Sequence, residues 1–176
     1  MDKRSDKYYI DEALKKAKIA AKEGDIPVGC IIVYKENKNN KKMCEVAKAA
    51  GILDGRIVAR AYNRRTKDKN AISHAEILAI SKACKRFKDF RLEECTMYVT
   101  LEPCQMCAGA IVQSRIKKLV IGAKSLKSGS CGSIINILDN NEFNHKVELV
   151  YLDDAECKDL LKSFFKKIRD DKRNKV

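Results

Sequence analysis

The sequence contains no apolar run that approaches the roughly 20 residues needed for a helix to span a bilayer. Its first residues, MDKRSDKYY, also lack the apolar stretch of a secretory signal peptide. These two absences argue against an integral membrane protein and against secretion. We therefore expect no membrane partner and a cytoplasmic location.

Linker-like composition is absent as well. The 176-residue chain has two prolines and eight glycines, and no stretch rich in Pro, Gly or Ser divides it. We find no internal repeat, and a chain of this length can bury a core as one domain. These features predict a single domain over residues 1–169, followed by a disordered basic tail over residues 170–176.

Acidic residues are too few to balance the basic ones. The 24 Asp and Glu residues face 37 Lys and Arg residues, which gives a formal net charge of +13. A field of this size attracts polyanions, and it exceeds what solubility requires. Because no membrane-binding segment is evident, nucleic acid is the partner that this charge favours.

Cysteine is abundant, but its spacing does not indicate a disulfide framework. Of the eight cysteines, only Cys104 and Cys107 stand at the spacing of a motif. The other six are scattered among apolar or helical stretches, where free thiols usually behave as small core residues. We expect these six to be unpaired and mostly buried.

Apolar periodicity predicts alternating helices and strands, and hence an α/β sandwich with some parallel pairing. The segment between the first two strands, residues 35–55, is rich in Lys and Asn and is predicted to be an elaborated surface loop with room for a helical turn. Ser73 is a candidate N-cap for the second helix. The predicted helices cover residues 8–24, 73–87, 104–114 and 153–169, and the predicted strands cover residues 28–34, 56–62, 96–101, 118–122 and 147–152.

The motif PCQMC places Cys104 and Cys107 one turn apart at the start of a predicted helix. Both thiols can face one ion there, and the helix N-terminus favours the thiolate form. Such a pair fits a redox dithiol, half of a structural zinc ribbon, or two ligands of a catalytic metal. The chain has no second CxxC, which argues against the ribbon.

His74 and Glu76 open another predicted helix in the sequence HAE. A lone helical histidine is more commonly an ordinary core or surface residue than a metal ligand. One His and two Cys nevertheless make a catalytic Zn²⁺ site with one position left for water, whose pKa such zinc lowers to about 7. Zinc-dependent nucleobase deaminases have this H-x-E and P-C-x-x-C pattern. Glu76 would then be the catalytic proton shuttle rather than a surface carboxylate.

Longer stretches of the chain resemble the bacterial tRNA adenosine deaminase family, within the wider cytidine deaminase fold. The resemblance covers nearly the whole chain. It implies a cytidine deaminase-like three-layer α/β/α sandwich with a central five-stranded mixed sheet. The stretches that carry it are GDIPVG, Asn63–Arg64, HAEILAI, YVTLEPCQMCAGAI, SRI, GSCGS, Asn144–His145 and Glu156–Cys157 with LLKSFFKKIR.

The resemblance also implies a substrate and a set of contacts. The substrate would be the wobble adenosine of a tRNA anticodon stem-loop, deaminated to inosine by a homodimer. Asn63 would recognise the flipped base, and Val28 would lie against its ring. The last predicted helix would contact RNA through an aromatic residue beside phosphate-binding charge, namely Phe165, Lys166, Lys167 and Arg169.

Two positions depart from the family pattern. Ser125 stands where the family usually carries an acidic residue that helps to hold the RNA backbone, and the loop over residues 35–55 is longer than the family norm.

We also expect Phe164 or Phe165 to pack the last helix on the sheet.

Two other functions remain open. A deaminase of a free base such as guanine or cytosine would share the zinc chemistry, but a small neutral base needs no basic surface. A non-catalytic, zinc-stabilised RNA-binding subunit would explain the charge, but it would not need Glu76.

Overall fold

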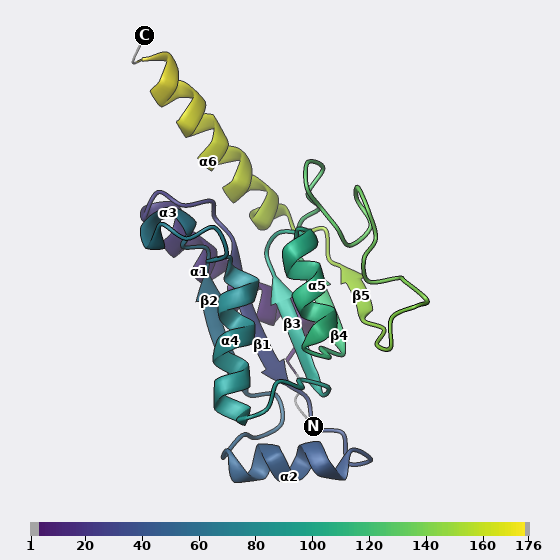
Figure 1. Ribbon diagram of the computed structural model, residues 1–176. Coiled ribbons are helices and arrows are strands. Elements are labelled where there is room, and N and C mark those ends of the chain that lie inside the picture. The colour runs from purple at the N-terminus through teal and green to yellow at the C-terminus, as the bar shows by residue number, and fades with distance from the viewer. Residues whose placement is uncertain (1–3, 175–176) are drawn as a thin grey trace.

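A computed structural model describes residues 4–174 and contains one five-stranded sheet in the order β2-β1-β3-β4-β5 (Figure 1). β1 pairs antiparallel with β2 and β3, whereas β3, β4 and β5 are parallel to one another. The predicted five-stranded mixed sheet is thus confirmed. Its strands are β1 (Gly29–Tyr34), β2 (Ile57–Tyr62), β3 (Cys95–Val99), β4 (Lys118–Ile121) and β5 (Glu148–Tyr151).

Helices cover both faces of the sheet, which confirms the three-layer sandwich. Successive residues of β1 point to opposite faces. Ile31 packs in the core beneath α1, and Ile32 packs in the second core, beneath α4 and α5. The helices are α1 (Asp6–Lys22), α2 (Lys41–Ala49), α3 (Arg65–Asp68), α4 (Ala75–Phe87), α5 (Gln105–Gln113) and α6 (Ala155–Arg173).

Two glycines fix the position of α1 against the sheet. A Cβ atom at Gly29 would stand 2.0 Å from the backbone oxygen of Ala13, so the close approach of α1 to β1 requires glycine at this position. Gly24 follows the helix with a φ of 79°, a conformation that glycine adopts without strain. The predicted helix stop at Gly24 is therefore confirmed.

The segment over residues 35–55 is more ordered than the loop we predicted. It contains the nine-residue helix α2, which buries Met43 and Ala47, and the following Ile52 is buried as well. A helix this short is marginal in isolation and depends on tertiary packing. The sequence permitted a helical turn here but did not show which apolar side chains would reach the core.

Two smaller differences lie between β2 and α4. The four-residue helix α3 was not predicted. The N-cap of α4 is His74 rather than Ser73, and the His74 side chain makes no capping hydrogen bond. Ser73 is instead buried immediately before the cap.

The last helix is longer and less buried than predicted. α6 begins behind the N-cap Asp154, buries only Cys157, and then projects beyond the body of the domain (Figure 1). Leu160 and Leu161 pack against the core, whereas Phe165 is exposed and its neighbour Phe164 is half-buried outside both core clusters. The aliphatic pair therefore anchors the helix, and our expectation for the phenylalanines was wrong.

The predicted disordered tail is also corrected in part. Residues 170–173 belong to α6, whereas residues 175–176 of that predicted tail lie outside the described residues. Among the described helices, none is long and apolar enough to cross a membrane.

The cysteines follow the prediction. All eight are unpaired. Of the six outside the PCQMC motif, Cys44 and Cys84 are half-buried and the other four, Cys30, Cys95, Cys131 and Cys157, are buried.

Candidate metal centre and base pocket

The structure brings His74, Cys104 and Cys107 together from two helices. His74 is the N-cap of α4, Cys104 is the N-cap of α5, and Cys107 lies in the first turn of α5. The His74 Nδ1 atom is 3.7 Å from the Cys104 Sγ atom and 3.5 Å from the Cys107 Sγ atom. All three ligand atoms lie within 4.8 Å of one another. Residues 30 positions apart thus form one donor cluster.

This cluster fits a zinc ion in its dimensions and its chemistry. Zinc bonds of about 2.3 Å to sulfur and about 2.0 Å to nitrogen place tetrahedral S and N ligands about 3.5 Å apart. The two S···N distances of 3.7 Å and 3.5 Å agree with that geometry. Two thiols and one imidazole supply three protein ligands, which is the number found in catalytic rather than structural zinc sites.

Electrostatics favour a thiolate at this cluster. Hydrogen bonds from the Cys107 thiol and from His74 lower the pKa of Cys104 to about 4, although partial burial opposes the shift. A deprotonated thiol is the form that binds metal. The same Cys107–Cys104 hydrogen bond raises the pKa of Cys107, so the pair favours one thiolate, at Cys104.

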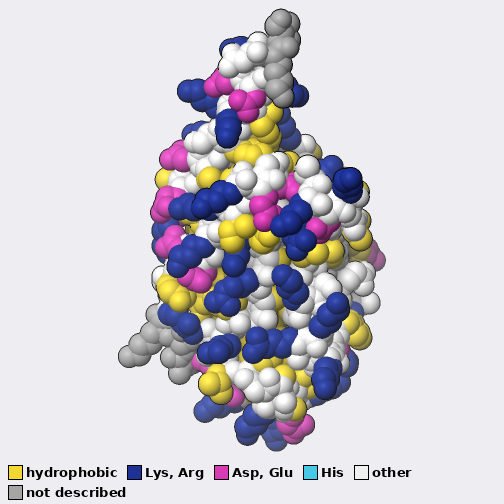
Figure 2. Space-filling view, turned by 90° about the vertical axis from the view of Figure 1, so that its left-hand side faces the viewer, with side chains coloured by type: hydrophobic (Ala, Val, Ile, Leu, Met, Phe, Trp, Pro, Cys, Tyr) yellow, Lys and Arg dark blue, Asp and Glu magenta, His cyan; other side chains and the backbone are white. Residues whose placement is uncertain are grey.

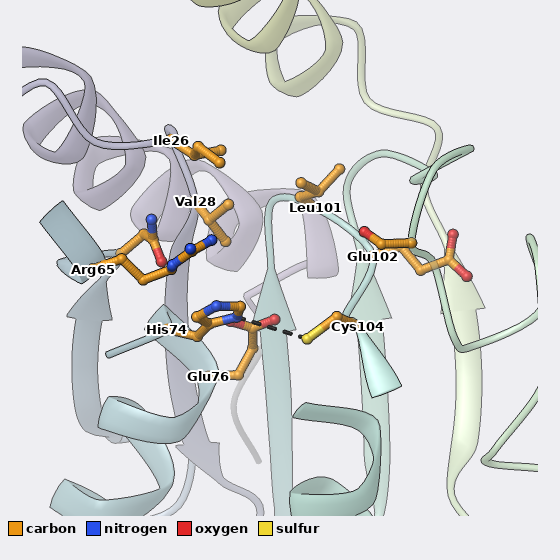
Figure 3. A pocket seen from close by; sticks show the side chains of 10 residues that line it. Ile26, Val28, Arg65, His74, Glu76, Leu101, Glu102 and Cys104 are labelled. Atoms are coloured by element: carbon orange, nitrogen blue, oxygen red, sulfur yellow. Dashed lines mark hydrogen bonds between the residues drawn. The ribbon is translucent and has the colours of Figure 1, made fainter. Parts of the chain in front are cut away.

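Glu76 lies beside the cluster, two residues along α4 from His74, and its side chain is buried (Figure 3). Burial raises the pKa of Glu76 to about 7, because the charged form loses its hydration. A carboxyl group in such a position can accept a proton and return it near neutral pH. Glu76 is not a member of the donor cluster.

A pocket opens above these residues. Figure 3 shows Val28, Leu101 and Arg65 above His74 and Glu76; Val28 directly precedes β1, Leu101 follows β3, and Arg65 opens α3. The structure therefore gathers the predicted base-contacting residues, Asn63 and Val28, into the pocket that contains His74. The complete lining is Ile26, Val28, Asn63, Arg65, His74, Glu76, Leu101, Glu102, Cys104 and Ser128.

Asp25 holds Asn63 in place, and sequence reasoning missed this role. The Asn63 amide nitrogen Nδ2 donates to Asp25 Oδ1 at 2.9 Å, and both side chains are buried. The second Asp25 oxygen accepts a 2.9 Å hydrogen bond from the backbone N–H of Thr66 in α3. Asp25 thus fixes the orientation of the Asn63 amide and the start of α3, which includes the pocket residue Arg65. The signal available in the sequence was the acidic residue Asp25 within the GDIPVG motif.

Glu102 is a second residue whose role only the structure revealed. Its buried carboxylate accepts backbone hydrogen bonds of 3.0 Å from Ser125, Cys131 and Ser133, and a further one from the Ser133 hydroxyl. Burial disfavours the charge, but these donors outweigh it and hold the pKa of Glu102 below its usual value. Glu102 therefore holds the loop after β4 in place. Ser125 takes part through its backbone N–H, which donates to the Glu102 carboxylate.

The structure separates the four predicted RNA contacts on α6. Phe165 and Arg169 line a groove between α6 and the loop over residues 124–128, which adjoins the base pocket at Ile26. Lys166 and Lys167 line neither this groove nor the one on the other side of α6. Lys167 is two residues from both Phe165 and Arg169, which is about 200° around the helix. It therefore lies on the opposite face of α6 from these two groove residues.

Comparison with known proteins identifies the class. A family model described as MafB19-like deaminase matches residues 4–169, so the chain belongs to the deaminase family. It is 40% identical over 169 residues to a tRNA-specific adenosine deaminase of Bacillus subtilis strain 168, covering 96% of this chain and 93% of that protein. It is also 40% identical over 162 residues to the enzyme of the same name from Aquifex aeolicus strain VF5, covering 92% of this chain and 95% of that protein. Within the deaminases, the chain belongs to the tRNA-specific adenosine deaminases.

Solved structures agree with this assignment. A tRNA:A34 deaminase, studied for A-to-I editing at the wobble position of transfer RNA, superposes with a TM-score of 0.74 and 30% identity, covering 88% of this chain and 99% of that chain. A guanine deaminase from Bacillus subtilis superposes with a TM-score of 0.55 and 30% identity, covering 70% of this chain and 66% of that chain. The resemblance to the tRNA deaminase is therefore both more complete and structurally closer than that to the guanine deaminase.

Proposed function

We propose that this protein is a zinc-dependent hydrolase that deaminates the wobble adenosine of a tRNA anticodon loop to inosine. The observation that carries the proposal is the His74, Cys104 and Cys107 cluster with Glu76 buried beside it, at a pocket that also contains Asn63. His74, Cys104 and Cys107 would hold the metal. When bound there, zinc would lower the pKa of a water molecule to about 7 and so provide the nucleophile at neutral pH.

Glu76 would move the protons of the reaction. Its carboxylate accepts a proton from water as the oxygen adds to the amino-bearing carbon of adenine, and it delivers that proton to the adjacent ring nitrogen. The remaining hydroxyl proton then passes by way of Glu76 to the amine, which leaves as ammonia. The burial of Glu76 supports this assignment, because it brings the pKa near the pH at which proton exchange is efficient.

Asn63 would select the base. Because Asp25 accepts one N–H of its amide, the Asn63 carbonyl oxygen and its second N–H are available to the edge of a purine. Val28 supplies an apolar contact for the ring on the same wall of the pocket. The base would reach this pocket by flipping out of the anticodon loop, where unpaired nucleotides are the least costly to extrude.

The groove beside α6 would receive the flanking RNA. It presents the exposed ring of Phe165 next to Arg169, Lys162 and two lysines of the loop after β4. An aromatic ring among cations is typical of surfaces that stack bases and bind phosphates. Lys166 and Lys167 would reach more distant phosphates. The homodimer that the resemblance implies and the cytoplasmic location expected from the sequence are part of the same proposal.

Incubation with anticodon stem-loop transcripts and with free guanine, cytosine and adenine tests the function. We expect inosine at the wobble position of the transcript and no ammonia from the free bases. The reason is that a net charge of +13 attracts a polyanionic RNA but contributes nothing to the binding of a neutral base. Ammonia from a free base without inosine in RNA would favour the free-base deaminase. RNA binding without either product would favour a non-catalytic subunit.

We expect Asn63→Ala to reduce deamination much more than RNA binding. The loss of a buried hydrogen-bonding amide typically costs about 1–3 kcal/mol, which corresponds to a roughly 5- to 150-fold lower kcat/KM. Phosphate contacts, which supply most of the affinity, remain unchanged. Single-turnover inosine formation and equilibrium binding are measured on the same hairpin. Asn39→Ala, at an exposed position before α2, is the matched control. Equal losses in binding and rate would contradict the assignment.

A further inference from the structure

Four arginines surround another cavity, on the outer edge of the sheet and away from the base pocket. Arg4 precedes α1, Arg56 precedes β2, Arg60 lies within β2, and Arg86 lies near the end of α4. Together with Tyr8 and Ile57 they line the whole cavity, and no acidic residue contributes to it. Three segments far apart in the sequence thus converge on one concave basic surface, which we call the arginine edge.

Two of the four arginines at this edge are not neutralised by neighbouring carboxylates. In the described part of the chain, Arg56 and Arg86 are exposed and form no ion pair, and Arg60 approaches only Glu12, at 3.7 Å. Glu12 is itself paired with Lys15. Lys82 of α4 adds another cation, since its ammonium group donates to the Arg60 backbone oxygen at 2.9 Å.

Arg4 is held in position at this surface. Its guanidinium donates to the backbone oxygen of Gly55 at 2.7 Å and lies over the rings of Tyr8 and Tyr9, 5.6 Å and 5.4 Å from their centroids. A guanidinium fixed in this way loses little conformational entropy when it binds an anion. Figure 2, which looks onto the β2 side of the molecule, shows Lys and Arg side chains spread over the lower half of this face.

The arginine edge lies within reach of an RNA stem whose loop occupies the base pocket. Arg60 precedes Asn63 by three residues and Arg56 precedes it by seven, or about 10 Å and about 23 Å at roughly 3.3 Å per strand residue. Arg86 is twelve residues from His74 along α4, or about 18 Å at roughly 1.5 Å per residue. At about 3.4 Å per nucleotide, these distances correspond to roughly three to seven base-pair steps.

We propose that the arginine edge binds the phosphodiester backbone of the substrate RNA's stem, beyond the loop that enters the base pocket. The proposal rests on the proposed function, because it assigns a second contact surface to the same substrate. Guanidinium groups match phosphate oxygens bidentately, and several of them along a strand edge suit a row of phosphates rather than one small anion. Arg and Lys also protect an edge strand from pairing with another chain, which is the competing explanation.

Two hairpins that share one anticodon loop test the proposal. One has a stem of about four base pairs, which ends before most of the arginine edge, and the other has about ten, which extends past it. We compare the parent with R56Q/R86Q, since both side chains are exposed and lack ion pairs. K41Q/K48Q, at two exposed positions of α2, is the control with the same change in net charge. Affinity, its salt dependence and single-turnover inosine formation are measured for each.

For the long hairpin, R56Q/R86Q should bind roughly 5- to 60-fold more weakly at about 0.1 M salt, with a log–log salt slope smaller by roughly 1.4–1.8. Its affinity for the short hairpin and the maximal rate of inosine formation should stay at the parental values. K41Q/K48Q should leave the difference between the two hairpins unchanged.

Three results would overturn the assignment. Equal weakening on both hairpins, or the same effect in K41Q/K48Q, would indicate a general effect of net charge. Parental binding together with greater self-association of R56Q/R86Q would indicate edge protection. Failure of the parent to form inosine on either hairpin would instead contradict the proposed function, while the stem-length dependence of binding still tests the arginine edge.

Discussion

Replacing Glu76 with alanine is expected to lower the rate of deamination by about 10²–10⁴-fold, because one positioned acid–base group typically contributes that much. The carboxylate would serve more than one proton transfer, so we expect a value near the upper end. RNA affinity should change little, since Glu76 is buried, lines the base pocket and belongs to neither of the two surfaces proposed to bind the RNA outside that pocket. Single-turnover inosine formation and equilibrium binding on one hairpin measure the two effects separately.

The control for this prediction is Glu45→Gln, an exposed carboxylate on α2, which should retain parental activity. Glu76→Gln provides a second test, because it keeps the size of the side chain but cannot accept a proton. Metal content should stay at the parental level in both Glu76 variants. Activity above about a tenth of the parental value in both would exclude Glu76 as the proton shuttle.

Purified protein is expected to contain close to one zinc ion per chain, and replacement of the ligands should remove it together with measurable deamination. His74→Ala, Cys104→Ser and Cys107→Ser each leave two protein ligands, fewer than the three of known catalytic zinc sites. Metal analysis and inosine formation are the measurements. Cys84→Ser, on the same helix as His74 but outside the donor cluster, is the matched control and should keep its metal.

Two further observations on the parent separate loss of metal from loss of folding. A chelator should lower its melting temperature, because a metal that binds only the native state stabilises it by mass action. Addition of zinc should then restore both the melting temperature and the activity. Zinc at equal stoichiometry in the parent and in the ligand variants would contradict the assignment of the donor cluster.

The two proposed RNA-binding surfaces, the groove beside α6 and the arginine edge, would bind different parts of the substrate. The groove beside α6 contains an aromatic ring and lies next to the base pocket, so it suits the unpaired nucleotides that flank the flipped base. The arginine edge contains guanidinium groups and lies about 10–23 Å away along β2, so it suits the backbone of a duplex. Neither surface reads a base, which leaves that task to Asn63.

The sequence by itself determined the two halves of the metal site, because each half is local, whereas the fold brings His74 to Cys104 and Cys107. Cys104 and Cys107 are one helical turn apart, and His74 and Glu76 open another helix, so each pair had its relative direction fixed by helix geometry. Apolar β-branched runs likewise predicted the five strands, and the mixed sheet that the family resemblance implied is confirmed, whereas the order of the strands was supplied by the structure.

Only the tertiary structure decided the features that depend on residues far apart in the chain. The burial of Met43 in α2, the hydrogen bond from Asn63 to Asp25 and the loop anchored on Glu102 all join segments that no periodicity connects. The arginine edge was equally hidden, since Arg4 and Arg86 are 82 positions apart in the sequence and appear there as ordinary surface charges. Such contacts exist only in the folded domain, because the assembled sheet holds these segments together against the entropy of the intervening chain.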